Sequence, residues 1–133
     1  MNETESAAVL ELANRFVAAI EARDVETVRR CYAPQARIWH NVDGKVQSVD
    51  DNIKGVHWIH KVLSGVQCFD KRRLAIPGGF LQEHVLRGTL PGGEAFAMPA
   101  CVVCTVEGGV ITALDEYLDS AHTRPLVAAS QRG

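Results

Sequence analysis

Residues 95–119 read AFAMPACVVCTVEGGVITALDEYLD and indicate the architecture of this 133-residue chain more strongly than any other segment. Two runs rich in β-branched and apolar residues, 95–106 and 110–119, flank the dipeptide Gly108–Gly109. Such runs are typical of strands, and a short glycine connection is typical of a tight hairpin turn. The segment therefore predicts an antiparallel β-hairpin.

Two more strands are expected upstream of this hairpin, at about 67–76 and 80–90. Pro-Gly-Gly triplets at 77–79 and 91–93 separate these runs from each other and from the hairpin. Because connections this short join antiparallel neighbours, the four runs together predict an antiparallel meander.

The first part of the chain is predicted to contain two helices. Apolar residues recur with helical spacing between about residues 6 and 22, which indicates an amphipathic helix. Asp24 is a favourable N-cap for a short second helix, and Ala33–Pro34 is expected to end it because proline disfavours helical geometry in the residue before it.

A strand over 37–42 and a third helix are expected next. Ser48 or Asp50 is the expected cap of that helix, which runs to about Leu63 and has Gly65 as its stop. A short coil or single turn is expected beyond residue 121. Three helices followed by four strands is the α+β pattern.

Composition and charge exclude several classes of function. Acidic and basic residues are interspersed and give a net charge of -2, so the chain lacks the clustered positive charge that nucleic acid requires. No apolar run approaches the roughly 18 residues needed to cross a bilayer, and the acidic N-terminus does not resemble a signal peptide. We therefore expect a cytoplasmic protein with no nucleic-acid or membrane partner.

The cysteines and histidines give little indication of a metal site. Cys101 and Cys104 are three residues apart on an expected strand, where their side chains point to opposite faces. They are expected to be reduced core residues, as are the other two cysteines. His57 and His60 are spaced for shared ligation on the third helix, but solvated helix residues are far commoner, and no metal is expected.

The strand at 100–106, ACVVCTV, is apolar on both faces rather than alternating. A strand of this kind needs cover on both sides of its sheet, and three helices cover one side. We therefore expect a homodimer that packs through the outer sheet faces. The alternative is a monomer whose outer face is Val-rich and partly exposed.

Three strings resemble a known family. They are YAPQARIWHN at 32–41, GTLPGG at 88–93 and GVITALDEYLD at 109–119, and their order and spacing resemble the SnoaL-like branch of the nuclear-transport-factor-2-like superfamily. The resemblance covers about residues 7–126 of a single domain. It implies a cone-shaped fold, in which three N-terminal helices pack on a strongly curved antiparallel sheet that encloses a pocket. The superfamily includes ketosteroid isomerases, limonene epoxide hydrolases, polyketide cyclases and non-catalytic binders. We expect no organic cofactor for this chain.

The resemblance also implies which positions line the pocket. His40 stands where ketosteroid isomerases carry an aspartate base, and Glu116 stands where SnoaL-type cyclases carry a pocket aspartate. Ile38 and His40 match a water-holding tyrosine and asparagine of limonene epoxide hydrolases. Their arginine and an aspartate match Gln82 and His84, whereas a shift of one residue offers Glu83 and Val85 instead. The catalytic residues of neither the ketosteroid isomerases nor the limonene epoxide hydrolases are all present in this chain.

Strand alternation supports the same residues independently, because each polar candidate has apolar neighbours two positions away. The expected catalytic residues are His40, His84 and Glu116. Each could instead be structural: His40 as a histidine bonded to backbone, His84 through the uncertain register, and Glu116 if Asp115 or Tyr117 faces inward. The expected substrate-binding residues are Phe16, Ile20, Ile38, Trp58, Gln82 and Tyr117.

These residues predict a cofactor-independent acid–base enzyme of the isomerase, cyclase, dehydratase or hydrolase type. Its expected substrate is a small, mostly apolar carbonyl or cyclic compound, with His40 as base, Glu116 as partner acid or orienting carboxylate, and His84 polarising or positioning the substrate. The alternative is a non-catalytic small-molecule-binding or dimerisation module of the same fold.

Overall fold

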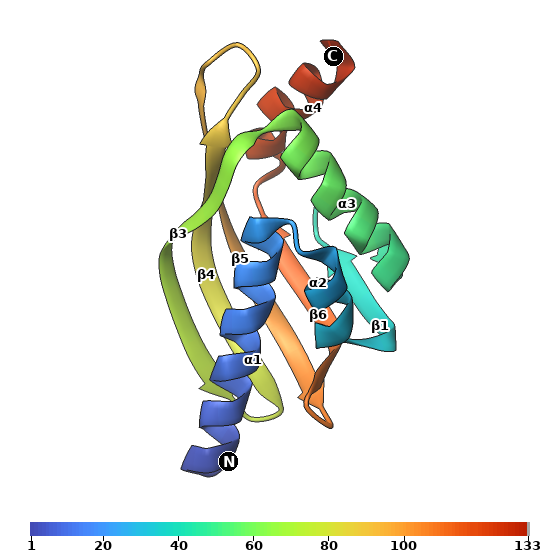
Figure 1. The fold of residues 1–133 in the computed structure, drawn as a ribbon, viewed down its shortest axis with the longest axis vertical. Coiled ribbons are helices and arrows are strands. Elements are labelled where there is room, and N and C mark those ends of the chain that lie inside the picture. Colours follow the sequence, from blue (N-terminus) through green and yellow to red (C-terminus); the bar gives the residue numbers. More distant parts are fainter. Residues whose placement is uncertain (133) are drawn as a thin grey trace.

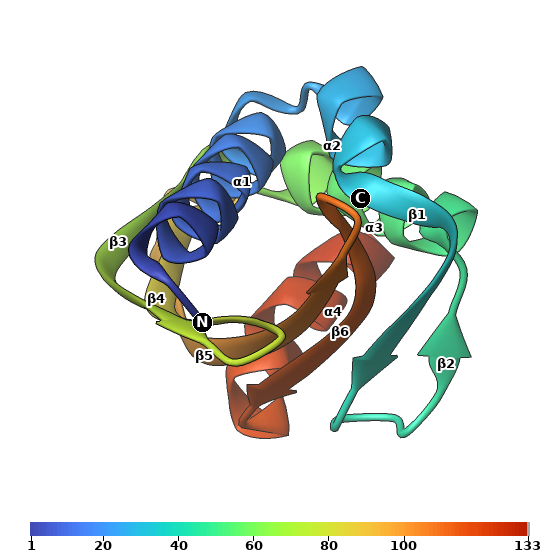
Figure 2. The same cartoon turned by 90° about the horizontal axis from the view of Figure 1, so that it is seen from below.

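Six strands form one strongly curved sheet, and helices close its concave side (Figures 1 and 2). The computed structural model describes residues 1–132. Its elements are, in chain order, α1 (Glu3–Ala22), α2 (Val25–Cys31), β1 (Tyr32–His40), β2 (Val46–Gln47), α3 (Val49–Val62), β3 (Ser64–Ile76), β4 (Gly79–Thr89), β5 (Ala95–Glu107), β6 (Val110–Leu118), the 3-10 turn Ser120–Thr123 and α4 (Arg124–Arg132). The α+β, cone-shaped architecture expected from the sequence is confirmed.

The sheet has the strand order β2-β1-β6-β5-β4-β3. Strands β3 to β6 form the expected antiparallel meander. Strand β1 departs from the expected antiparallel arrangement, because it pairs parallel with β6. Parallel neighbours need a long connection, and α3 with β3 to β5 supplies it. This pairing sets Ile38 opposite Leu114 and His40 opposite Glu116.

A bulge helps the sheet to curve. On β3, Phe69 pairs with Val85 and Arg72 pairs with Glu83, so Asp70 and Lys71 together lie opposite one position of β4 and β3 carries one extra residue. Asp70 has a positive φ of 54°. An extra residue bends the strand that carries it and increases its twist. In Figure 2 the sheet curls from β3 round to β1 beneath α1, α2 and α3.

One of the two expected caps of α3 is confirmed, whereas two other boundaries differ from the sequence-based expectation. Helix α3 is capped by Ser48, whose side chain accepts from the Asp51 N–H in a capping box, so Ser48 rather than Asp50 begins it. Gly65 lies inside β3 and does not stop the helix. Strand β1 begins at Tyr32, and Pro34 sits within it, where the pairing with β6 is irregular and the missing N–H costs little.

The C-terminal segment was expected to be a short coil or single turn, and that expectation is wrong because a helix follows the turn. It folds as a 3-10 turn followed by α4. Leu126 and Ala129, three residues apart on one helix face, are buried against Val62, Leu63 and Met98. The physical reason for the helix is this second apolar cluster, which the four-residue turn and α4 cover at the end of the cone seen at the top of Figure 1.

The main core lies between α1, α2 and the inner face of the sheet. Phe16 and Val17 from α1 meet Ile38, Phe80 and Ile111, and the last three are fully buried. Within residues 1–132 no helix is long and apolar enough to cross a bilayer.

All four cysteines are free thiols. Cys104 is buried on the inner face of β5, whereas Cys101, three residues earlier, belongs to the opposite face and is half-buried. The alternation expected for this pair is thus confirmed. Cys68 lies at the edge of the core on β3.

Candidate active site

A cavity of about 340 Å³ lies between the helices and the inner face of the sheet. Its wall is mostly apolar, with side chains from α1, α3, α4 and from strands β1 and β3 to β6. A few polar groups interrupt that wall, and the three expected catalytic residues are among them: His40, His84 and Glu116. An apolar cavity with a few placed polar groups is the usual form of a small-molecule site.

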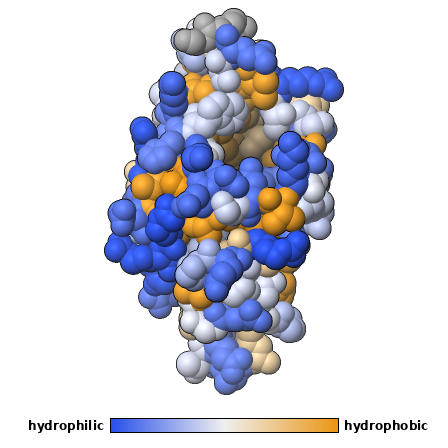
Figure 3. Space-filling view, turned by 90° about the vertical axis from the view of Figure 1, so that its right-hand side faces the viewer, coloured by the Kyte–Doolittle hydropathy of each residue, from blue (hydrophilic) through white to orange (hydrophobic). Residues whose placement is uncertain are grey.

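The molecular surface is hollowed on the side that carries β1 and α3. In the space-filling view of Figure 3 this face is hollowed in its upper half, and apolar residues are visible at the bottom of the hollow. Phe16, Ile20 and Trp58, expected as substrate-binding residues, line the cavity, and Trp58 is 38% exposed. A ligand can therefore reach an apolar interior from solvent on this side.

His40 and Glu116 form the central polar pair of the cavity. His40 Nε2 lies 2.9 Å from Glu116 Oε1, and each side chain is 19% exposed. The parallel pairing of β1 with β6 brings them together, because it places the two residues directly opposite each other on the inner face. Among the described residues, His40 Nδ1 and Glu116 Oε2 make no hydrogen bond, so both atoms remain free to exchange protons with a ligand.

The pair sets the charge of the histidine. The hydrogen bond to Glu116 raises the pKa of His40 above its usual 6.5, and this effect outweighs burial, which acts in the opposite direction. The hydrogen bond therefore favours the imidazolium form of His40. A group of this kind can take a proton and return it within one turnover.

His84 has a different environment on β4. Burial is the largest influence and lowers the pKa of His84. Its Nδ1 lies 2.9 Å from the side-chain nitrogen of Gln82, and the amide oxygen of Gln82 accepts a 2.7 Å hydrogen bond from Arg73 Nε. His84 is therefore held neutral beside the cavity, whereas His40 is biased toward the cation.

Three expected substrate-binding residues lie outside the cavity wall. Ile38 is fully buried in the core. Gln82 is also fully buried, and its side chain is occupied by Arg73 and His84. Tyr117 is 46% exposed and packs edge-on against Trp39 on the outer face, because alternate residues of β6 face opposite sides.

The structure resolves the two uncertainties of register. On β4 the inner residues are Gln82, His84 and Leu86, so Glu83 and Val85 face outward. On β6 Glu116 faces the cavity, so Asp115 faces outward together with Tyr117.

Tyr32 and Asn52 are among the polar residues of the wall that sequence reasoning missed. Tyr32 is buried, lines the cavity and donates a 2.9 Å hydrogen bond from its hydroxyl to Asn52 Oδ1 of α3. Burial raises the pKa of Tyr32 well above 10, so it stays a neutral donor. The helical spacing of Asn52 from Val56 and Ile59, which also line the cavity, was the signal that could have found it.

His57 and His60 of α3 each have a separate hydrogen-bond partner. His60 Nε2 lies 2.7 Å from the Ile20 carbonyl, and His57 Nδ1 accepts from Arg23 Nε at 3.1 Å. Both rings therefore tie α3 to the end of α1. Across residues 1–132 no three His, Cys, Asp or Glu side chains gather in a way that would hold a metal ion.

Comparison with known proteins identifies the family. Residues 13–114 match the SnoaL-like domain, and the chain belongs to this family. No curated protein matches the chain significantly. Solved structures match its fold closely although their sequences have diverged widely.

Three of these structures illustrate the likeness. A Jannaschia protein proposed to be a SnoaL-like polyketide cyclase has a TM-score of 0.80 at 11% identity, with 98% of this chain and 96% of that chain covered. AclR of Streptomyces galilaeus, proposed to be a hydroxylase, has a TM-score of 0.79 at 15% identity, with 96% of this chain and 83% of that chain covered. A hypothetical protein of Catenulispora acidiphila with a ketosteroid isomerase-like fold was solved in complex with trimethylamine. It has a TM-score of 0.71 at 16% identity, with 80% of this chain and 84% of that chain covered. These likenesses establish the fold.

Proposed function

We propose that this protein is a cofactor-independent acid–base enzyme of the isomerase, cyclase, dehydratase or hydrolase type. Its substrate is a small, mostly apolar carbonyl or cyclic compound held in the cavity. The observation that carries the proposal is the 2.9 Å contact between His40 and Glu116 within an otherwise apolar wall. His40 acts as the base, Glu116 orients it or returns the proton, and His84 polarises or positions the substrate.

Deuterium exchange tests the proposal whichever of these reactions the enzyme completes. The purified protein is incubated in D₂O with a panel of small cyclic ketones and enones, and mass spectrometry follows uptake of deuterium next to the carbonyl. We expect catalysed exchange with at least one compound, because a base that removes such a proton returns solvent deuterium. Compounds that bind in the cavity but never exchange would instead assign the protein to the alternative class, a binding module.

The His40–Glu116 contact also predicts how stability depends on pH. Because the folded protein raises the pKa of His40 above the unfolded value, the contact's stabilisation is fully present below pH 6.5 and is lost as pH rises through the folded pKa. His40→Asn should therefore reduce the free energy of unfolding more at pH 5.5 than at pH 9, as measured by urea denaturation. A difference between the two proteins that grows with pH would contradict the assigned contact.

We also propose that the protein forms a homodimer through the outer face of β1, β5 and β6. Trp39 and Tyr117 pack edge-on there, beside the half-buried Val103. Arg37 and Asp115 bring opposite charges to the same face, and a two-fold axis could pair each of them with its counterpart on the second subunit. Light scattering should give twice the 14.5 kDa chain mass, and Val103→Arg should give the single mass. A monomeric wild type would refute the dimer.

A further inference from the structure

Three polar side chains form a chain of hydrogen bonds across two strands of the sheet. Arg73 on β3 lies directly opposite Gln82 on β4 and donates from Nε to the amide oxygen of Gln82 at 2.7 Å. The amide nitrogen of Gln82 lies 2.9 Å from Nδ1 of His84, two residues along the same strand. Gln82 is fully buried, so its amide has no water with which to exchange these partners.

The chemistry of the donors fixes the direction of this chain. A guanidinium group carries only donors, so the side of the amide that faces Arg73 must be the oxygen. The NH₂ group of Gln82 therefore faces His84, and Nδ1 of His84 must accept. A proton on Nδ1 would set two donors against each other, which excludes both the Nδ1–H tautomer and the imidazolium ion.

We propose that Arg73 and Gln82 are positioning residues that hold His84 as the neutral Nε2–H tautomer, which donates a hydrogen bond to a carbonyl or enolate oxygen of a cavity ligand. The ligand part of this inference rests on the proposed function, whereas the tautomer does not. His84 itself lines the cavity, and its Nε2 makes no hydrogen bond to any of the described residues.

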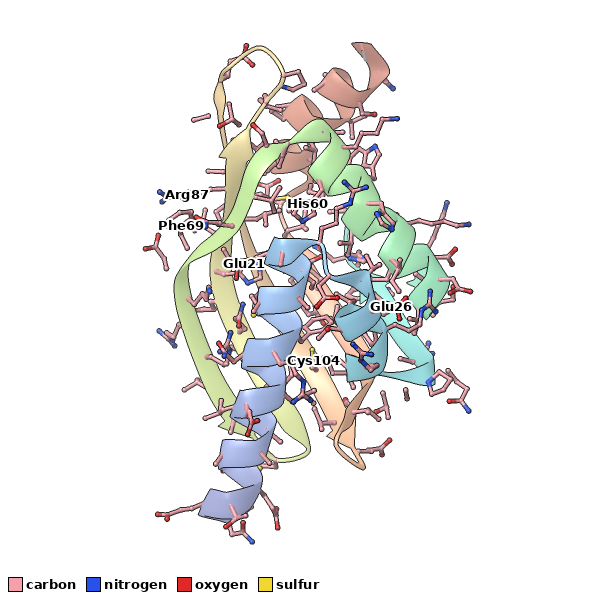
Figure 4. The ribbon with its side chains drawn as sticks, in the orientation of Figure 1. Glu21, Glu26, His60, Phe69, Arg87 and Cys104 are labelled. Carbon is pink, nitrogen blue, oxygen red and sulfur yellow. The ribbon has the colours of Figure 1, made fainter. Side chains whose placement is uncertain are left out.

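Some surroundings of His84 lower its pKa and others raise it. Burial is the largest influence and disfavours the imidazolium, with Lys71 and Arg73 of β3 acting in the same direction. Glu116 of β6 and Glu21 of α1 act in the opposite direction. Glu21 is engaged elsewhere, since it accepts from the Cys68 N–H at 2.8 Å and lies 3.5 Å from Lys71 Nζ, and Figure 4 shows it beside β3 at the end of α1.

The strand order leaves room for a ligand between His84 and the His40–Glu116 pair. His84 is on β4 and Glu116 is on β6, with β5 between them. Neighbouring strands are about 4.8 Å apart, so β4 and β6 lie roughly 10 Å apart. The two residues are also offset along β5, because His84 pairs with Ala100 and Glu116 pairs with Val102. A small carbonyl compound between them would meet a donor on one side and the His40–Glu116 pair on the other. The two histidines then have separate roles, because their surroundings push the two pKa values apart.

The tautomer is measurable in the ligand-free protein. Long-range ¹H–¹⁵N correlation of the ¹⁵N-labelled histidine rings distinguishes a protonated from an unprotonated ring nitrogen. At pH 7 we expect His84 to show a protonated Nε2 and an unprotonated Nδ1. An Nδ1–H ring or an imidazolium would overturn the proposal, even if the deuterium-exchange assay had succeeded.

Substitution of Gln82 should reverse the tautomer. Gln82→Glu replaces the NH₂ donor with a carboxylate of nearly the same shape, so His84 should place a proton on Nδ1 and titrate at a higher pH. Gln67→Glu is the matched control, because Gln67 is exposed on the neighbouring strand and brings the same change of charge. A folded Gln82→Glu protein that keeps the wild-type tautomer would overturn the inference.

Arg73 provides a second test that leaves the cavity unchanged. Arg73→Met removes the donor that fixes the amide, so the amide can rotate and both neutral tautomers should be observed. Arg72→Met is the control, because Arg72 lies on the outer face and contacts Glu83 at 3.4 Å.

Added cyclohex-2-enone, at the limit of its solubility, should shift the Nε2 proton of His84 in the wild type. The absence of a shift would refute the ligand part alone.

Discussion

Glu116→Gln is expected to reduce turnover of the exchanged ketone by about 10²–10⁴-fold, the usual contribution of a placed acid–base group. The substitution keeps the shape of the side chain but removes the negative charge that holds the His40 imidazolium. The pKa of His40 should therefore fall, because Glu116 is the main cause of its increase. Steady-state kinetics and titration of the His40 ring measure the two effects separately.

Asp115→Asn is the matched control for this prediction. Asp115 is the neighbouring carboxylate on the same strand, but it faces outward and does not line the cavity. The control should retain turnover within about a few-fold. Replacing His40 and Glu116 together with inert isosteres should cost little more than Glu116→Gln alone, because residues that act as a unit are not additive. A double variant that keeps wild-type turnover would refute the assignment.

Phe80→Ala is expected to lower the free energy of unfolding by about 3–5 kcal/mol. Phe80 is fully buried on the inner face of β4, among α1, β1 and β5 residues of the main core. Its removal leaves a cavity beneath α1 that the sheet cannot close. Urea denaturation measures the loss, with circular dichroism to confirm that the variant folds.

Phe69→Ala is the control for position. Phe69 is 41% exposed, and its ring lies 5.1 Å from the Arg87 guanidinium; Figure 4 shows both side chains beside β3, away from α3. Removing an exposed ring should cost about 1 kcal/mol or less. Equal losses at the two positions would mean that the core has been placed on the wrong face of the sheet.

Strand alternation pointed to His84 and Glu116 as candidates, although the sequence left the register of both strands open. The hairpin turns set the register of the meander, and a one-residue alternation then placed Glu116 and His84 on the inner face. The same alternation should have excluded Tyr117, since it is adjacent to Glu116 on β6. Local patterns are reliable here because a strand exposes successive residues to opposite environments.

The rest depended on contacts between distant segments. No local pattern shows that β1 pairs parallel with β6, and this pairing is what sets His40 opposite Glu116. Likewise, Gln82 was expected to contact substrate because nothing in the sequence reveals that Arg73 lies across from it. Helix α4 was missed although Leu126 and Ala129 have helical spacing, because its stability comes from the cluster that it covers.

Titration of the histidine rings by NMR tests the acid–base site most directly. In the ligand-free protein, the ring of His40 should titrate above pH 6.5 and the ring of His84 below it. Glu116→Gln should lower the pKa of His40, whereas Asp115→Asn should leave it unchanged. Ordinary values near 6.5 for both rings, or the reverse order, would contradict an acid–base pair in this cavity and favour a binding module.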